Sequence, residues 1–272
     1  MTYARPTLAL LALAPLAAGC LPVGDDASRA EMRTAVVEIA DLGAADGAQA
    51  EIIELTTSFT LGAAVAEARE ELRDFVVSQV PCSEVTLADA TLTIDFGDLS
   101  DACVYRGRTY AGVVSVSVAK EGDTWKVAHT YDGLTGGRAT LDGTADVEWT
   151  DNVRHIVTNL DIVSDRGQWH VEADRTQTFT SCSDATAVCV DIDGERTWSG
   201  PRGDWDMTIE GIHARSIDPV PESGTYTVVT PEDNVIELGF ARVDEDTIEV
   251  SVVSGRRDFA FHVTAAGQVS DA

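Results

Sequence analysis

Positively charged side chains are scarce in this sequence. Its 272 residues include 19 lysines and arginines against 46 aspartates and glutamates, which gives a formal net charge of -27. Only Lys120 and Lys126 are lysines. Nucleic acids and anionic membrane surfaces bind proteins through cationic side chains that neutralise phosphates. The charge balance therefore argues against both as partners, and we expect no nucleic acid to bind.

Sequence signatures of common catalytic and nucleotide-binding sites are missing. The chain contains no GxSxG nucleophile elbow, no HExxH zinc motif, no Walker loop and no GxGxxG loop. An enzyme is not excluded on this ground, but the sequence favours a protein without catalytic activity. We expect no cofactor.

Long apolar runs are also rare, and the one that stands out lies at the N-terminus. Thr7–Ala18 is an apolar run that follows the positive charge of Arg5, as in an export signal. A membrane-spanning helix needs about 20 apolar residues, so this run is too short to span a bilayer comfortably. The sequence predicts a signal peptide over residues 1–19.

The residues Leu16–Cys20, LAAGC, end this signal. They resemble the lipobox of bacterial lipoproteins, in which the signal is cut before a cysteine that carries a lipid. The resemblance implies that Cys20 is the first mature residue, that it is lipidated (with palmitate among the acyl groups), and that the chain is anchored in the cell envelope. In that family an aspartate after the cysteine favours the inner membrane, so Leu21 implies the outer membrane. An ordinary secretory signal, with Cys20 in a disulfide, is the alternative.

Four cysteines remain if Cys20 is lipidated, and an even number in an exported chain favours disulfides. Their spacing favours Cys82 with Cys103 and Cys182 with Cys189, because the other pairings demand long-range contacts. A zinc site is the competing interpretation, but the CxxC spacing typical of such sites is absent.

The region between a polar tether (residues 20–27) and residue 80 has helical spacing. Apolar residues share one face from Met32 to Ile39, and Gly43 is a stop signal for this first helix. A second helical pattern runs over residues 49–79, with a weak middle that permits a kink. We therefore expect one or two N-terminal α-helices over residues 28–80.

Apolar residues alternate with polar ones from Val85 onward, which predicts antiparallel strands. Tight turns at Asp151-Asn152, Asp165-Arg166 and Gly255-Arg256, with a three-residue loop at 136–138, place the apolar residues of successive hairpins on one face. The expected opposite pairs include Trp125 with Trp149, Val147 with Ile156, Leu160 with Val171, Ile162 with Trp169, and Val250 with Phe261.

The fold class is therefore mainly β, with the helices first. We expect a long antiparallel meander of about ten strands over residues 82–265, forming a large twisted sheet or an open barrel, and a tail over residues 266–272. Residues 215–224, RSIDPVPESG, predict a surface connection, because prolines do not fit central strands.

Residues 92–118 resemble a segment of a group of uncharacterised, β-rich envelope lipoproteins of Gram-negative bacteria. The resemblance is carried by an IDFG strand end, a cysteine, a Gly-Arg turn and a further glycine: Ile94, Asp95, Phe96, Gly97, Cys103, Gly107, Arg108 and Gly112. That group has no activity to transfer, so the likeness implies fold and anchoring only.

Three acids are expected to face histidines on the polar side of the sheet: Glu148 with His155, Asp161 with His170, and Glu249 with His262. Such a pair is the orienting half of a catalytic triad and also suits a metal. Acids are so frequent in this chain that solvated cross-strand pairs are the favoured interpretation.

A further histidine, His129, falls on the apolar face, and we expect it at the edge of the core with a hydrogen-bond partner. The candidate calcium ligands are Asp191, Asp193 and Glu195 in VDIDGE. Because Asp-Gly is also a favoured hairpin turn, and further acids of a calcium loop are missing, a turn is favoured there.

The sequence thus predicts a lipid-anchored envelope protein that serves as a non-enzymatic binding or structural module for an unknown envelope or extracellular partner. One alternative is a carrier of lipid or another hydrophobic ligand, with a curled sheet around an apolar cavity. The other is an envelope hydrolase, which would show a cleft with a histidine, an acid and a nucleophile in hydrogen-bond reach.

Overall fold

The computed structural model describes residues 26–57, 65–101, 103–181, 189–215 and 217–272. Two helices come first, α1 (Arg29–Thr57) and α2 (Val65–Gln79), and a short 3-10 turn, η1 (Leu99–Asp101), lies between the early strands. The strands of the described residues are β1 (Glu84–Ala88), β2 (Thr91–Asp95), β3 (Cys103–Tyr105), β4 (Arg108–Glu121), β5 (Thr124–Thr135), β6 (Ala139–Thr150), β7 (Val153–Ser164), β8 (Gly167–Thr180), β9 (Cys189–Gly200), β10 (Gly203–Arg215), β11 (Ser223–Val229), β12 (Val235–Arg242), β13 (Thr247–Ser254), β14 (Arg257–Thr264) and β15 (Val269–Asp271).

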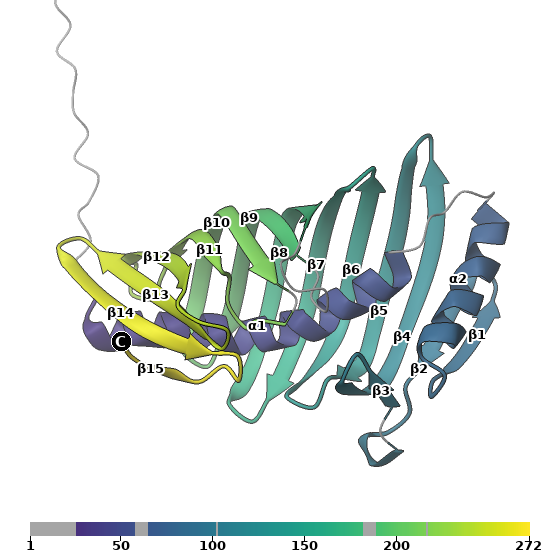
Figure 1. The fold of residues 1–272 in the computed structure, drawn as a ribbon, viewed down its shortest axis with the longest axis horizontal. Coiled ribbons are helices and arrows are strands. Elements are labelled where there is room, and N and C mark those ends of the chain that lie inside the picture. The colour runs from purple at the N-terminus through teal and green to yellow at the C-terminus, as the bar shows by residue number, and fades with distance from the viewer. Residues whose placement is uncertain (1–25, 58–64, 102, 182–188, 216) are drawn as a thin grey trace, which may run out of the picture.

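All strands belong to one antiparallel meander, which confirms the expected fold class. The sheet has 15 strands that follow chain order from β1 to β15, except that β3 pairs only with β4, beside the main path. It is not closed, since β1 and β15 are its two edges (Figure 1). The strand number exceeds the expected ten, and the expected tail over residues 266–272 contains β15, which pairs with β14.

The expected registers are confirmed across the central hairpins. Leu160 lies opposite Val171 and Ile162 opposite Trp169. The other expected pairs are also found: Val147 with Ile156, Trp125 with Trp149, and Val250 with Phe261. Two-residue turns, and a three-residue loop between β5 and β6, fix these registers. A slip by one residue would turn every apolar side chain to the solvent.

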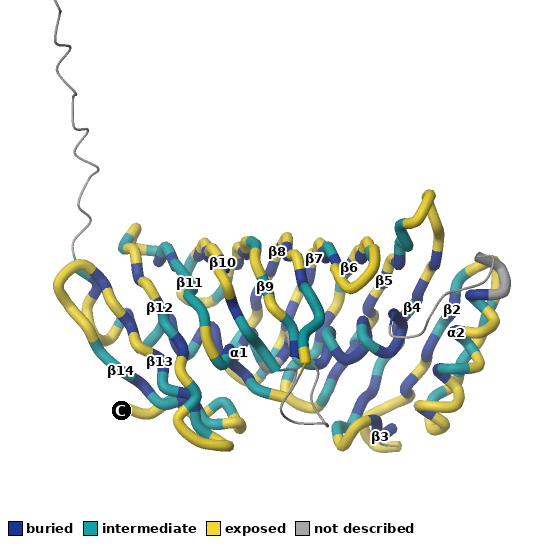
Figure 2. The backbone as a smooth tube through the Cα atoms, turned by 45° about the horizontal axis from the view of Figure 1, so that its top comes forward, coloured by how far each residue is buried: buried dark blue, intermediate teal, exposed yellow. Residues whose placement is uncertain are grey.

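Helix α1 lies across the concave face of the curved sheet (Figures 1 and 2). It starts beside the last strands, where Arg33 donates to the carbonyl of Val269, and ends at β5, where Thr56 contacts His129. Its buried apolar residues point to several sides of the helix: Met32, Val36, Ile39, Leu42, Ile52, Ile53 and Leu55. A helix buried on most of its circumference fits a sheet that curls around it.

Gly43 does not end the first helix, contrary to the expectation, because α1 continues through it to Thr57. The loop between β10 and β11 packs there: a Cβ atom on Gly43 would lie 2.0 Å from the carbonyl oxygen of Pro219. Pro219, Val220 and Pro221 are buried, so this loop is not the expected surface connection. Because glycine has no side chain, the loop can approach the helix backbone closely at Gly43 while the helix continues.

The expected disulfide between Cys82 and Cys103 is present, with a Cα–Cα distance of 5.3 Å. Cys189 is also disulfide-bonded, and its partner lies outside the described residues, as do Cys182 and Cys20. Within the described ranges, no helix has both the length and the apolar character needed to cross a bilayer.

Because the loop packs closely on Gly43, we expect replacement of this glycine by alanine to destabilise the protein, which is the opposite of the usual effect in a helix. Alanine normally stabilises a helix by about 1 kcal/mol relative to glycine. For Gly43→Ala we expect the free energy of unfolding to fall by about 1–3 kcal/mol, because the new methyl group overlaps the Pro219 carbonyl. Urea denaturation measures this change.

Gly47→Ala, one helical turn further on, is the matched control. A Cβ atom on Gly47 would lie 2.8 Å from Nη1 of Arg108, the far end of a flexible side chain that can move away. We expect this variant to be as stable as the natural protein, or more stable by up to about 1 kcal/mol. A Gly43→Ala variant at least as stable as Gly47→Ala would contradict the proposed packing.

Candidate functional site

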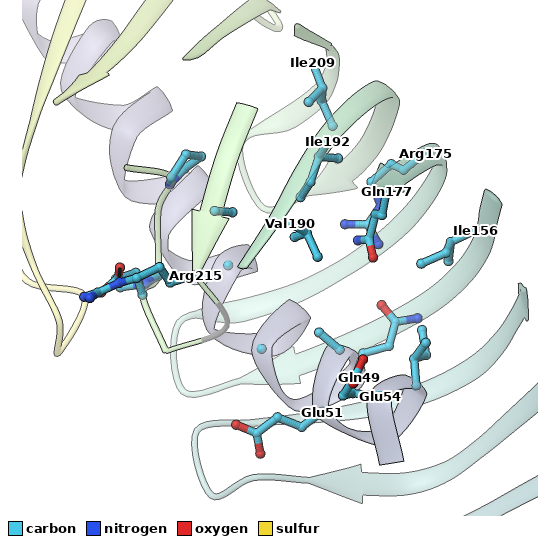
Figure 3. A pocket seen from close by; sticks show the side chains of 18 of the residues that line it. Gln49, Glu51, Glu54, Ile156, Arg175, Gln177, Val190, Ile192, Ile209 and Arg215 are labelled. Carbon is cyan, nitrogen blue, oxygen red and sulfur yellow. Dashed lines mark hydrogen bonds and ion pairs between the residues drawn. The ribbon is translucent and has the colours of Figure 1, made fainter. Parts of the chain in front are cut away.

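A cavity of about 120 Å³ lies between α1 and the concave face of the sheet. Its walls come from the second half of α1, from the turn between β3 and β4, from β7 to β11, and from the loop at residues 218–221 (Figure 3). For comparison, an engineered cavity of about 150 Å³ in another protein binds benzene. The space therefore suits a small molecule.

Much of the cavity wall is apolar. Inward-facing positions of the strands contribute Ile156, Val190, Ile192 and Ile209, and Tyr226 adds an aromatic ring from β11. Figure 3 shows Val190, Ile192 and Ile209 on neighbouring strands on one side, across from the helix. An apolar part of a ligand would be covered on this side.

Three arginines occupy inward positions of the same strands. Arg154, Arg175 and Arg196 are only 3%, 7% and 5% exposed. Arg154 lies opposite Gln177, two residues from Arg175 on β8. Arg175 in turn lies opposite Gly194, two residues from Arg196 on β9. The three side chains therefore follow a diagonal across β7, β8 and β9, in which neighbours lie roughly 7–8 Å apart.

Arg154 is held by hydrogen bonds to both the helix and the sheet. Its Nη1 donates to Glu54 at 3.2 Å and to Thr57 at 3.0 Å, and its Nη2 donates to Gln177 at 3.3 Å. Burial lowers the pKa of Arg154 to about 10, although Glu54 opposes the shift. The guanidinium group therefore keeps its charge at neutral pH.

One buried N–H donor on the wall, Nε of Arg154, has no acceptor among the described residues. The side chain of Gln49, which is 1% exposed, has the hydroxyl of Tyr131 as its hydrogen-bond partner. Figure 3 shows Gln49 reaching from α1 toward the sheet, and the polar ends of Arg175 and Gln177 pointing down from β8. A buried donor without an acceptor costs about 1–3 kcal/mol, so Nε of Arg154 is expected to meet an acceptor.

Arginines are frequent in the wall of the cavity, although the protein is strongly acidic. The described residues of the wall include five arginines and three carboxylates, whereas the whole chain has a net charge of -27. Arg215 pairs with Asp218 at 2.8 Å, and Arg175 and Arg196 also have interaction partners.

The acid-histidine pairs lie on the outer face, away from the cavity and from one another. His170 contacts Asp161 at 2.9 Å, and His262 contacts Glu249 at 3.7 Å. Glu148 lies opposite His155 in register but contacts Lys126 at 3.3 Å, while His155 contacts Asp174 at 2.6 Å. All these side chains are substantially exposed.

The VDIDGE segment is not the expected turn, because Asp191, Asp193 and Glu195 lie within β9. Asp191 contacts His213 at 2.7 Å, and Asp193 accepts from the backbone N–H of Gly211 at 2.8 Å. Within the described part of the chain, no three acidic, histidine or cysteine side chains are placed to hold a metal ion. Gly194 lies within the strand, at a point where the neighbouring strand comes very close. A Cβ atom there would lie 2.2 Å from the carbonyl oxygen of Asp174.

Sequence reasoning missed the arginine diagonal, although its signal was present. The expected registers place Arg154 on the face of Ile156, Arg175 on the face of Trp169, and Arg196 on that of Trp198. An arginine at an apolar-face position of an alternating strand is therefore the pattern that marks this site.

Comparisons with known proteins give no independent lead to a ligand. No protein-family model matches the chain, and neither the curated proteins nor the solved structures include a match. Its function has to be inferred from the residues that line the cavity.

His129 lies inside the core at 1% exposure, deeper than the expected edge position. Its Nδ1 lies 3.2 Å from the carbonyl of Ala145, which accepts only, so Nδ1 carries the proton. Nε2, 2.7 Å from the hydroxyl of Thr56, is then the acceptor of the neutral ring. Burial lowers the pKa of His129 to about 4.

This histidine predicts a loss of stability in mild acid. The unfolded chain takes up the proton below its ordinary pKa of 6.5, whereas the folded protein resists it down to about 4. Stability from neutral His129 is present above pH 6.5 and is lost as the pH falls toward 4. By linkage, we expect a loss of about 2–3 kcal/mol between pH 7 and pH 4.5 from this group.

His129→Gln separates this effect from the titration of carboxylates. Urea denaturation at pH 7 and at pH 4.5 gives the free energy of unfolding of both proteins. The drop between the two pH values is expected to be about 2–3 kcal/mol smaller in the variant. An equal drop in both proteins would show that His129 titrates normally and is not buried as described.

Proposed function

We propose that this chain is an exported protein of the bacterial cell envelope that is anchored by a lipid on Cys20 and acts as a non-enzymatic binding module. In this proposal a small ligand occupies the cavity beneath α1. The lipobox resemblance supports the anchor, and Leu21 supports the outer membrane. The observation that carries the binding function is the cavity itself, because it combines an apolar wall with a buried donor, Nε of Arg154, that lacks an acceptor among the described residues.

The start of the described chain is compatible with an anchor. The N–H of Ala27 donates to Ser254 at 3.1 Å, and Arg257 donates to the carbonyls of Asp26 and Ala27. The chain therefore enters the fold at the turn between β13 and β14, and none of these residues lines the cavity. A lipid ahead of residue 26 would leave the cavity residues free to bind.

Two other functions receive less support. A lipid carrier needs a large open concavity, whereas α1 occupies the concave face and the cavity measures about 120 Å³. A hydrolase needs a nucleophile and a base, and the described lining residues include no histidine, serine or cysteine. The groups on the wall are those that bind and orient a molecule.

The anchor is tested by metabolic labelling with a clickable palmitate analogue in the native host. We expect the natural protein to be labelled and Cys20→Ala to lose the label, because its thiol carries the lipid. Leu21→Asp is the control: it should keep the label and move from the outer-membrane to the inner-membrane fraction. Unchanged labelling of Cys20→Ala would rule out the anchor.

The binding function is tested by native mass spectrometry of the mature protein released from the envelope in mild detergent. A fraction of the protein should carry the extra mass of a small organic molecule, which denaturation releases. Ile192→Trp places an indole in the cavity and should abolish the extra mass, while circular dichroism checks that the sheet is retained. Folded natural protein with no bound molecule would contradict the proposed function.

A further inference from the structure

The point at which the chain enters the fold determines which surface lies next to the membrane, an inference that rests on the lipid anchor of the proposed function. We propose that a valine patch on the outer face of the sheet, made of Val229, Val235 and Val253, docks on the phospholipid bilayer that holds the anchor. The partner is a zwitterionic lipid surface, and the contact is apolar.

The three valines are neighbours on the solvent side of β11, β12 and β13. Val229 lies opposite Val235. Val253 lies opposite Glu237, two residues from Val235, so Val235 and Val253 are diagonal neighbours. Val235 is 56% exposed and Val253 is 42% exposed. The chain neighbours of these valines are fully buried on the inner face: Val228, Ile236 and Val252. Single exposed apolar side chains are ordinary, whereas adjoining ones favour an interaction surface.

Hydrogen bonds hold the start of the described chain beside this patch. The hydroxyl of Ser254 accepts from the N–H of Ala27 at 3.1 Å and donates to the carbonyl of Val235 at 2.8 Å. Arg257 donates to the carbonyls of Asp26 and Ala27 at 3.0 and 2.9 Å. The point of entry is therefore fixed against β12 and β13, with Val235 next to it.

The chain between the lipid and the fold is short. Cys20 and Asp26 are six positions apart. Even a fully extended chain of that length spans only about 20 Å. A lipid on Cys20 therefore keeps the valine patch within roughly that distance of the bilayer, because the patch adjoins the point of entry. The opposite edge of the sheet, at β1, lies at the other end of the molecule (Figure 1).

The short link also explains how a small patch is sufficient. Two surfaces joined by a short link meet at an effective concentration of about millimolar. Three valines would not hold a free protein on a bilayer. Once the lipid is inserted, the same three side chains stay in contact with the surface.

Carboxylates outnumber guanidinium groups around the patch, which disfavours an anionic surface. Glu237 and Asp258 lie opposite Val253 on its two neighbouring strands. The negative charges of this region are Asp26, Glu232, Asp233, Glu237 and Asp258, and the positive charges are Arg256 and Arg257. An anionic headgroup would be repelled here, whereas a zwitterionic one carries no net charge.

Nitroxide labels on the mature lipidated protein in phosphatidylcholine vesicles test the docking. The label is attached to Val235→Cys or Val253→Cys. Its collision rate with oxygen, relative to that with a water-soluble nickel chelate, rises with depth in the bilayer. We expect this ratio to be about threefold higher than for the same label in the protein without the lipid (Cys20→Ala), because the patch enters the headgroup region.

Val157→Cys is the matched control, since Val157 is 41% exposed on the same face but lies on β7. Its ratio should not change when the protein is anchored. An unchanged ratio at Val235, or an equal rise at Val157, would overturn the docking. Phosphatidylglycerol in about one third of the lipid should lower the ratio at Val235, because it adds negative charge. A higher ratio would overturn the choice of a zwitterionic surface.

A charge within the patch tests whether the valines act together. Val235→Asp should return the ratio at residue 253 to its value in solution, because a carboxylate opposes burial in the headgroup region. Val157→Asp is the control and should leave that ratio unchanged. Both valines are exposed, so we expect the sheet to be retained, which circular dichroism checks. An effect of Val157→Asp equal to that of Val235→Asp would contradict the patch.

Palmitate labelling and vesicle flotation separate the docking from the anchor. A protein that is labelled and floats with the vesicles, but whose nitroxides remain exposed to the nickel chelate, would refute the docking and leave the anchor standing. Absence of the palmitate label would refute the anchor, and the docking with it.

Discussion

The placement of α1 in the concave face of the sheet is the constraint on which the rest of the structure depends. A sheet with one apolar face needs a second layer, and here a single helix supplies it. Among the described residues, four ion pairs between helix carboxylates and arginines outside the helix set its position: Glu38 with Arg202, Asp41 with Arg166, Glu51 with Arg108, and Glu54 with Arg154. Buried pairs add little net stability, but a shift or rotation of the helix would leave several charges buried without partners.

The cavity follows from the way the two halves of the helix differ. The first half presents large apolar residues such as Met32, Val36 and Leu42, which are at most 1% exposed. The second half also has buried apolar residues, but it adds Gly43, Gly47 and polar residues, and it faces arginines where the other strands carry aliphatic residues. Small side chains opposite long charged ones do not fill space as two apolar surfaces do. The same residues that open the space also give its wall its polar groups.

Alternation was sufficient to predict the strand pairs, because two-residue turns make register a local property, as for Ile162 and Trp169. The helix was less predictable: Gly43 is a stop signal in sequence, and only the Pro219 carbonyl, distant along the chain, explains why the helix continues. Only part of the site could be predicted from the sequence. Period two places Arg175 on the apolar face, but the curvature that brings Gln49 across from it depends on the whole sheet.

The attachment of the first described residues to the last strands has a consequence for how the chain folds. Ala27 and Ser254 are bonded although 227 positions separate them, and Arg33 reaches Asp271 at the far edge. Contacts of such long range slow folding. Apolar surface that stays exposed until the strands that bury it have formed is prone to aggregate. Helix α1 is synthesised before every strand that buries it. The folding of this protein is therefore completed by its C-terminal hairpin, and truncation there exposes its N-terminal helix.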